Sequence, residues 1–260
     1  MTNANWTDGS AYERYMGRWS GLVAQSFVRW LAPTPGLDWL DVGAGTGALS
    51  LSLVEAGRAK HVTAVEPAAA LRAEAQRLRG HPAIAYTEGD AAHLPPGPFD
   101  GVASGLVLNF VPDAAAAVEA MRDATRADGT VAGYVWDYAD GMEFIRVFWE
   151  VAAEVDPAVA ALNQGARSDI CNPDALEVLW GRAGLRSVRN EGLGIDVVFA
   201  DFEDYWQPFT GGQGAAPTYV ASLDEARTER LRTTLRERLA GDSGTPIAMT
   251  ARAWAVAGTR

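Results

Sequence analysis

Three glycines alternate with other residues directly after an apolar run, and this pattern limits what the chain can fold into. The run Leu37–Val42 is typical of a buried parallel strand, and Gly43, Gly45 and Gly47 follow it. Glycines let the backbone turn sharply and approach a ligand closely. A helix predicted over about 48–56 would direct its N-terminal amides at that ligand. The pattern therefore indicates a nucleotide-cofactor site.

Two kinds of cofactor fit these glycines. The stretch Gly43–Ala48 also satisfies the dinucleotide fingerprint G-x-G-x-x-G/A, which is typical of NAD-dependent oxidoreductases. Asp41, two residues before Gly43, discriminates between them, because a carboxylate repels a pyrophosphate and attracts a cation. S-adenosylmethionine carries a sulfonium and an ammonium and no phosphate. Asp41 therefore favours S-adenosylmethionine and leaves the oxidoreductase as the weaker alternative.

The stretch Asp41–Gly47 resembles the first motif, D/E-x-G-x-G-x-G, of the class I S-adenosylmethionine-dependent methyltransferases, specifically their methyltransferase type 11, small-molecule branch. Three further motifs follow in the order that this family shows. Glu66 ends a predicted strand over 61–65, Glu88–Ala91 follows a predicted strand near 84–86, and a strand over 99–104 leads to Gly105. The specific part of the resemblance covers residues 10–138.

The resemblance implies a role for each of these stations. Glu66 would accept hydrogen bonds from the ribose hydroxyls, Asp90 and the Ala91 amide would hold adenine, and backbone near Gly105 would meet the methionine amine. In related enzymes an N-terminal segment covers the cofactor, and this predicts that Tyr15 and Arg18 lie near its carboxylate. The expected cofactor-binding residues are Asp41, Gly43, Gly45, Gly47, Glu66, Asp90, Ala91, Gly105, Tyr15 and Arg18.

Strand and helix patterns alternate from about residue 37 to 137, which predicts an α/β fold with a parallel sheet covered on both faces. The resemblance makes this a Rossmann-like, seven-stranded, mostly parallel sheet whose last strand is antiparallel. Further strands are expected over 130–136, 187–199 and 246–257. Further helices are expected over 68–79, 113–127, 142–162, 173–183 and 223–239.

We expect one methyltransferase domain over 1–260, with N-terminal helices covering the cofactor over 1–36 and a cofactor-binding half over 37–137. Residues 138–170 and 200–222 are interpreted as insertions that form a lid over the substrate, since ligands bind at the carboxyl edge of such sheets. The glycines and proline of the segment 205–219 predict an irregular loop there. The expected substrate-contacting residues are Trp136, Tyr138, Arg167, Tyr205, Trp206, Gln213 and Tyr219.

Methyl transfer from a sulfonium is an in-line displacement, so the protein mainly aligns the acceptor and excludes water. Asp137, at the end of a predicted strand, is the best-placed acid or base, and a helix or turn cap is its alternative role. None of the three histidines lies in an insertion. Asp201, Glu203 and Asp204 are better explained by helix capping than by metal binding, so no metal is expected.

Composition restricts the partners. A formal net charge of −11 and a pI near 4.7 disfavour nucleic acid and anionic membranes. The single cysteine, Cys171, excludes an internal disulfide, and no apolar run reaches the roughly 20 residues of a membrane span. The polar N-terminus shows no signal peptide, so a soluble, cytoplasmic enzyme acting on a small hydrophobic or aromatic molecule is expected. A member that binds the cofactor without methylating stays open, as do the acceptor atom and the oligomeric state.

Overall fold

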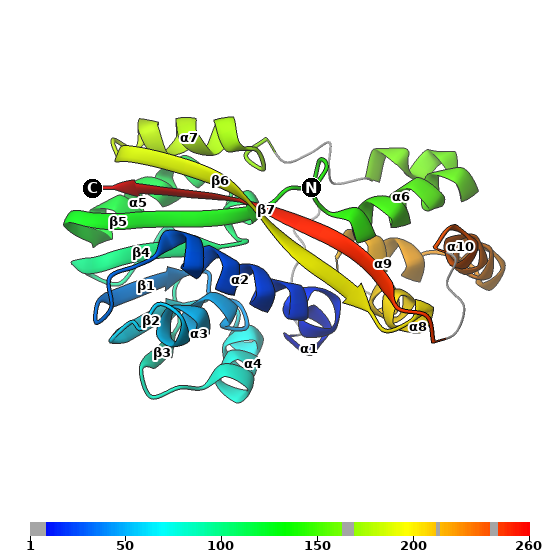
Figure 1. Cartoon of the computed structure of the whole chain (residues 1–260), viewed down its shortest axis with the longest axis horizontal. Helices are drawn as coiled ribbons and strands as arrows, with labels where there is room; N and C mark the ends of the chain where they lie inside the picture. The colour runs from blue at the N-terminus through cyan, green and yellow to red at the C-terminus, as the bar shows by residue number, and fades with distance from the viewer. Residues whose placement is uncertain (1–8, 163–168, 212–213, 240–243) are drawn as a thin grey trace.

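A computed structural model describes residues 9–162, 169–211, 214–239 and 244–260. One seven-stranded sheet organises them, in the order β3-β2-β1-β4-β5-β7-β6 (Figure 1). Six strands run parallel, and β7 is antiparallel to both of its neighbours. The strands are β1 Asp38–Val42, β2 His61–Val65, β3 Ile84–Thr87, β4 Phe99–Gly105, β5 Thr125–Trp136, β6 Arg186–Phe199 and β7 Ile247–Thr259. The predicted fold class is confirmed.

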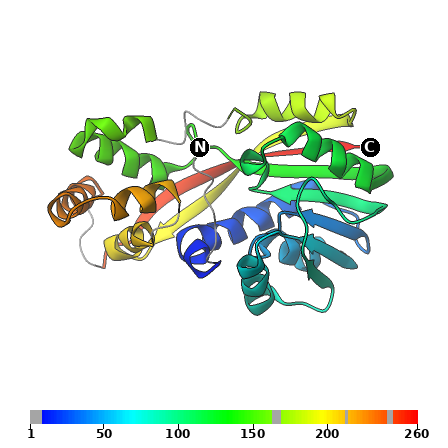
Figure 2. The same ribbon diagram turned by 180° about the vertical axis from the view of Figure 1, so that it is seen from behind.

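Helices cover both faces of this sheet. The central strands carry apolar side chains on both faces, and each face needs a layer of helices to bury them. Helices α2 and α3 pack on one face, and α5 and α7 pack on the other, as the view from behind shows (Figure 2). The longer helices are α2 Arg18–Leu31, α3 Ala48–Glu55, α4 Ala69–Arg79, α5 Ala114–Ala124, α6 Glu143–Val155, α7 Pro173–Arg182 and α10 Glu225–Arg238. The shorter ones are α1 Gly9–Tyr12, η1 Glu13–Gly17, η2 Leu108–Phe110, η3 Pro157–Leu162, α8 Phe202–Trp206, η5 Gln207–Thr210 and α9 Ala215–Ala221.

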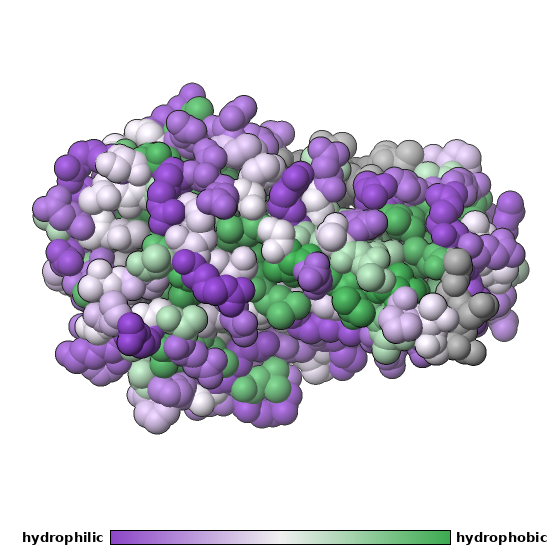
Figure 3. Space-filling model, viewed as in Figure 1, coloured by the Kyte–Doolittle hydropathy of each residue, from purple (hydrophilic) through white to green (hydrophobic). Residues whose placement is uncertain are grey.

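Strands β6 and β7 are the longest pair in the sheet, and their far ends carry a second group of helices. Helices α6, α8, α9 and α10 gather at that end of the two strands (Figure 1). Helices α6, α8 and α9 belong to the segments that were expected to form the lid, whereas α10 lies outside them. The face in this view shows apolar side chains gathered over α2, β6 and β7 (Figure 3). Leu22 on α2 and Val198 on β6 are among the exposed large apolar residues of the described part of the chain.

Two helices are shorter than predicted. Helix α5 ends at Ala124, because Thr125 pairs with Phe99 and already belongs to β5. The long helix expected over 142–162 ends at Val155, and a separate 3₁₀ helix begins at Pro157. A proline lacks the amide hydrogen that a continued α-helix needs, which accounts for the break.

The expected irregular loop over 205–219 is wrong. Most of the described part of this segment is helical, because α8, η5 and α9 bury aromatic rings against α6. Phe209 stacks on Phe148 with ring centroids 4.4 Å apart, and the Tyr205 hydroxyl donates to the Phe144 carbonyl at 3.0 Å. Burial of this aromatic area outweighs the local preference of glycine and proline for turns.

Gly101 on β4 leaves room for the indole ring of Trp39 on the neighbouring strand β1. It lies beside Trp39 in the register, and a Cβ at this position would lie 2.5 Å from the indole. We expect Gly101→Ala to lower the free energy of unfolding by about 1–3 kcal/mol through overpacking. Gly181→Ala on α7, where nothing lies within 4 Å, should instead raise it by about 0.5–1 kcal/mol. Urea unfolding of both variants tests this, and equal effects would contradict it.

Candidate functional site

A cavity of about 500 Å³ opens at the carboxyl ends of β1, β2 and β4. Parallel sheets bind ligands at this edge, and the volume is within the usual range for small-molecule sites. Its wall is formed by the glycine turn, the ends of β2 and β4, the start of α4 and the N-terminal helices. The sequence-predicted residues that line it are Asp41, Gly43, Gly45, Glu66, Asp90, Ala91 and Gly105.

The glycine turn is built by backbone conformations that require glycine. Gly43, Gly45 and Gly47 all have positive φ, at 74°, 55° and 88°. A Cβ on Gly43 would lie 2.6 Å from Val107, and one on Gly47 would lie 2.2 Å from the Tyr86 hydroxyl. The turn is therefore enclosed on both sides. Gly47 does not line the cavity itself, and it begins α3.

Asp41 places a buried carboxylate under this turn. The Ser50 hydroxyl donates to its Oδ2 at 2.6 Å, whereas Oδ1 is buried and has no hydrogen-bond partner in the part of the chain described. Burial raises the pKa of the Asp41 carboxyl to about 7; the Ser50 hydrogen bond opposes this rise and the nearby Glu66 carboxylate adds to it. A buried acceptor without a donor is costly. A cationic donor in the cavity would remove that cost.

Glu66 ties the turn to the end of β2. Its Oε2 accepts the Gly45 amide at 3.0 Å and its Oε1 accepts the Ala68 amide at 2.9 Å. Burial raises the pKa of Glu66, and these two hydrogen bonds limit the rise. Each carboxylate oxygen can accept more than one hydrogen bond, so both remain able to accept a hydroxyl from a ligand.

Asp90 lies at the far end of the cavity, on an exposed turn. Its Oδ1 accepts the amides of Ala92 and His93 at 2.9 and 2.8 Å and lies 3.0 Å from the His93 ring nitrogen. Asp90 thus shapes its own turn, which brings Ala91 and Ala92 to the cavity wall. The imidazole of His93 is largely exposed, and His93 does not line the cavity.

Leu106 belongs to the stretch that was expected to meet the methionine amine. It has φ 62°, a strained conformation for leucine, and its amide donates to the Tyr134 carbonyl at 2.7 Å. Tyr134 also lines the cavity, and the sequence did not predict it there. The Tyr134 side chain crosses the neighbouring strand, since a Cβ on Gly105 would lie 2.5 Å from its hydroxyl. Other missed lining residues are Tyr12, Ser20, Val107 and Phe110. Only their proximity in sequence to predicted site segments could have suggested them.

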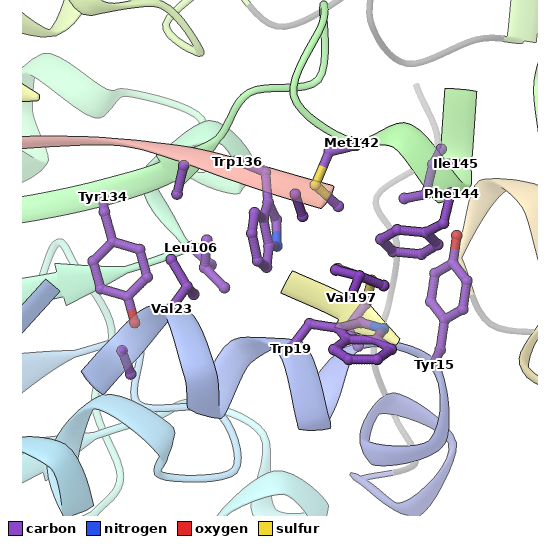
Figure 4. Close-up of a cluster of buried hydrophobic side chains, with 14 of the residues drawn as sticks. Tyr15, Trp19, Val23, Leu106, Tyr134, Trp136, Met142, Phe144, Ile145 and Val197 are labelled. Carbon is purple, nitrogen blue, oxygen red and sulfur yellow. The ribbon is translucent and has the colours of Figure 1, made fainter. Parts of the chain in front are cut away.

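The structure does not place Tyr15 and Arg18 at the cavity. Tyr15 packs edge-on against Phe209, with centroids 5.8 Å apart, and lies at the opposite end of the buried cluster from Tyr134 (Figure 4). Arg18 donates twice to the Asp204 carboxylate at 3.0 Å. The N-terminal helices face the cavity with Tyr12 and Ser20 instead, and contact of Tyr15 and Arg18 with the cofactor stays a prediction.

The aromatic residues expected to contact substrate are packed against one another. Trp136, Tyr205, Trp206 and Tyr219 are buried in the larger apolar cluster, and Tyr138 is partly buried against it. None of these five lines the cavity described above. Their contact with a substrate stays a prediction. Arg167 and Gln213 lie outside the described residues.

Asp137 has a structural role at the end of β5. Arg252 donates to its Oδ2 through two nitrogens at 2.8 and 2.5 Å, and the Asp140 amide donates to its Oδ1 at 3.2 Å. The carboxylate is buried, and Asp137 does not line the cavity. This arrangement matches the turn cap that the sequence left open and not the acid or base. Asp201 likewise caps α8 by accepting the Asp204 amide.

Comparison with known proteins agrees with this geometry. Residues 40–133 match the family model described as a methyltransferase domain. The part of the chain from β1 to β5 is therefore similar to a class I methyltransferase domain, as the sequence motifs predicted. An uncharacterized protein of Mycobacterium tuberculosis is 32% identical over 104 residues, which are 39% of this chain. That match spans about two fifths of the relative, or 38% of its length.

Solved structures of methyltransferases share this fold over most of the chain. A candidate type II methyltransferase of Anaeromyxobacter dehalogenans has a TM-score of 0.60 at 22% identity and covers 90% of this chain and 95% of its own. Phosphoethanolamine N-methyltransferase 2 of Haemonchus contortus, solved with S-adenosyl-L-methionine, has a TM-score of 0.58 at 15% identity. It covers 97% of this chain and 56% of its own.

Among the described residues, no group of three or more histidine, cysteine or acidic side chains is arranged to hold a metal ion. No helix in those residues is long and apolar enough to cross a bilayer.

Because the pKa of Asp41 is raised, we expect the binding of a cationic ligand to release a proton from its carboxyl group. A cation binds the ionised carboxyl, so binding of S-adenosylhomocysteine, which keeps the ammonium, should release a proton at about pH 6, where Asp41 is mostly neutral. The affinity should rise with pH and level off above about pH 7. Calorimetry in two buffers with different ionisation enthalpies measures the released protons. Asp41→Asn should remove most of the proton release. Asp38→Asn serves as the control, because Asp38 lies on the same strand and away from the cavity, and it should leave the release unchanged. Equal release from both variants would contradict the assignment.

Proposed function

We propose that this domain binds S-adenosylmethionine in the cavity and transfers its methyl group to a small, hydrophobic or aromatic molecule. The observation that carries the proposal is the buried, unpartnered Oδ1 of Asp41 beneath the glycine turn. A ligand ammonium is the donor that this oxygen lacks. Glu66, at the next strand end, is available for the ribose hydroxyls, and the Asp90 turn for adenine.

The hydrogen bonds of the turn favour this cofactor over a dinucleotide. The amides of Gly43 and Ala44 donate to the Val65 carbonyl, and the Gly45 amide donates to Glu66. The Gly47 amide donates to the Ala44 carbonyl within the turn. A pyrophosphate needs such amides unpaired and needs no carboxylate beside them. These contacts therefore support a cationic, phosphate-free cofactor.

The surroundings of the cavity support an apolar acceptor. Phe110, Val111 and Pro112 form an apolar rim on one side, and Phe110 is exposed. Charges near the expected lid are compensated, since Arg18 pairs with Asp204 and Asp137 with Arg252. An apolar acceptor loses little on entering such surroundings, whereas a charged one loses its hydration. The acidic net charge supports a small molecule and not a nucleic acid as the partner.

Methyl transfer of this kind asks little of the side chains beyond alignment. When bound, the cofactor would supply an electrophilic methyl group. A lone pair of the acceptor would form the new bond to the methyl carbon while the carbon–sulfur bond breaks, and neutral S-adenosylhomocysteine would leave. The residues of this chain hold the two ends of the cofactor, through Asp41 and Asp90, and keep water out with the apolar rim. Because Asp137 is held by Arg252, we assign no general base.

Binding and transfer can be measured separately. We expect calorimetric binding of S-adenosylmethionine and S-adenosylhomocysteine but not of NADH. Glu66→Gln should weaken both by about 1–3 kcal/mol, the cost of losing charge-assisted hydrogen bonds. Transfer of a labelled methyl group to a panel of apolar amines, phenols and thiols tests the reaction. Binding of NADH alone would overturn the proposal, and cofactor binding without transfer to any acceptor would favour a member that has lost methylation.

A further inference from the structure

Residues 9–20, comprising α1, η1 and the first turn of α2, lie across the mouth of the cavity, and we call them the N-terminal strap. Two of its side chains, Tyr12 and Ser20, line the cavity. The Tyr12 hydroxyl lies 2.8 Å from the Ser20 hydroxyl, which donates to the Met16 carbonyl at 3.1 Å. The strap is therefore internally bonded and forms part of the cavity wall.

Between these two residues, Glu13 fastens the strap to the cofactor-binding half. Two guanidinium nitrogens of Arg79, at the end of α4, hold its carboxylate at 2.8 and 3.0 Å. The hydroxyl of Thr46, inside the glycine turn, donates to the same carboxylate at 2.5 Å. Arg79 also donates to the Thr46 carbonyl at 3.0 Å. Glu13 thus joins the strap to both α4 and the turn.

This ion pair differs from the exposed pairs elsewhere on the surface. The Glu13 and Arg79 side chains are 19% and 14% exposed, whereas those of Arg146 and Glu150 on α6 are both 44% exposed. Exposed pairs add little to stability, while charge-assisted, bidentate pairs shielded from water are strong and geometrically specific. The contact is therefore able to hold the strap against α4 and the glycine turn.

Two glycines of the strap leave room for its contacts with α4 and for the Glu13 carboxylate. A Cβ on Gly9 would lie 2.7 Å from the Cβ of Glu74 on α4, and a Cβ on Gly17 would lie 2.3 Å from the Glu13 carboxylate. The Gly17 backbone is an ordinary right-handed helix, with φ −59° and ψ −41°, so conformation alone does not call for glycine there. The strap also contains a π-helix, η1, a form that is frequent at functional sites.

We propose that Glu13 is the latch that keeps the N-terminal strap closed over the cavity, and that release of this latch limits the rate at which the cofactor enters and leaves. The identity of the ligand rests on the proposed function, whereas the closure rests only on the contacts of Glu13. Glu13 acts through Thr46 and the strap, so it is a positioning residue and not a catalytic one.

Glu13→Gln keeps the size of the side chain and removes its charge. In the protein without ligand, hydrogen exchange of the strap amides should become faster. Dissociation of S-adenosylhomocysteine in stopped flow should accelerate about tenfold, as expected from the loss of charge-assisted bonds. Because entry is gated too, association should also accelerate, so the equilibrium affinity should change less than the dissociation rate. Glu150→Gln, which removes a carboxylate from the exposed pair with Arg146, should leave both rates unchanged.

Gly17→Ala distinguishes a latch from a plain helix. Alanine favours a helix, so a strap held only by its own helical structure would exchange more slowly. A latch predicts the opposite, since the added methyl group displaces the Glu13 carboxylate from Arg79. Circular dichroism checks that both variants are folded, and a variant that fails to fold leaves the other to decide.

Faster strap exchange with faster dissociation would support the proposal. Wild-type rates in Glu13→Gln, or faster exchange with an unchanged dissociation rate, would overturn it. If the wild-type protein binds no S-adenosylhomocysteine, the proposed function fails, and the exchange measurement still decides whether Glu13 closes the strap.

Discussion

The hydrogen bond from the Gly45 amide to the Glu66 carboxylate determines what the glycine turn can bind. It joins the turn after β1 to the end of β2, and it removes one of the amides that a phosphate would use. It also brings a second carboxylate close to Asp41, which contributes to the raised pKa of Asp41. The same bond thus creates a site that repels anions and requires a cation. The other features of the cavity follow from this local arrangement.

The sequence was sufficient to predict the parts of the cavity wall that are formed by short, continuous segments. Asp41, the glycines, Glu66 and the Asp90 turn belong to short segments whose geometry depends on their own residue types. The seven-stranded, mostly parallel sheet and its antiparallel last strand followed from the resemblance. By contrast, Tyr12, Ser20 and Tyr134 reach the cavity because of how separate elements pack, and no local pattern marks them.

The side chains that lie away from the cavity, although they were expected at the site, share a physical cause. Arg18 contacts Asp204, which is 186 residues away in the sequence, and Asp137 contacts Arg252 across 115 residues. The aromatic residues of 205–219 were expected in a loop, but a packed helical cluster buries more apolar area. In each case a long-range partner fixed the side chain. Motif spacing therefore predicts the cofactor site, whereas the proposed acceptor site would depend on packing between the strap, the end of β5 and the helices at the end of β6 and β7.

A crystal structure with S-adenosylhomocysteine bound would show whether Asp41 and Glu66 hold the cofactor as proposed. We expect the ligand's ammonium nitrogen within hydrogen-bonding distance of Asp41 Oδ1, about 3 Å, and both ribose hydroxyls on Glu66. We also expect the Gly45 amide to remain bonded to Glu66. An ammonium group directed away from an Asp41 that stays unpaired, or a ligand that displaces Glu66 from Gly45, would contradict it.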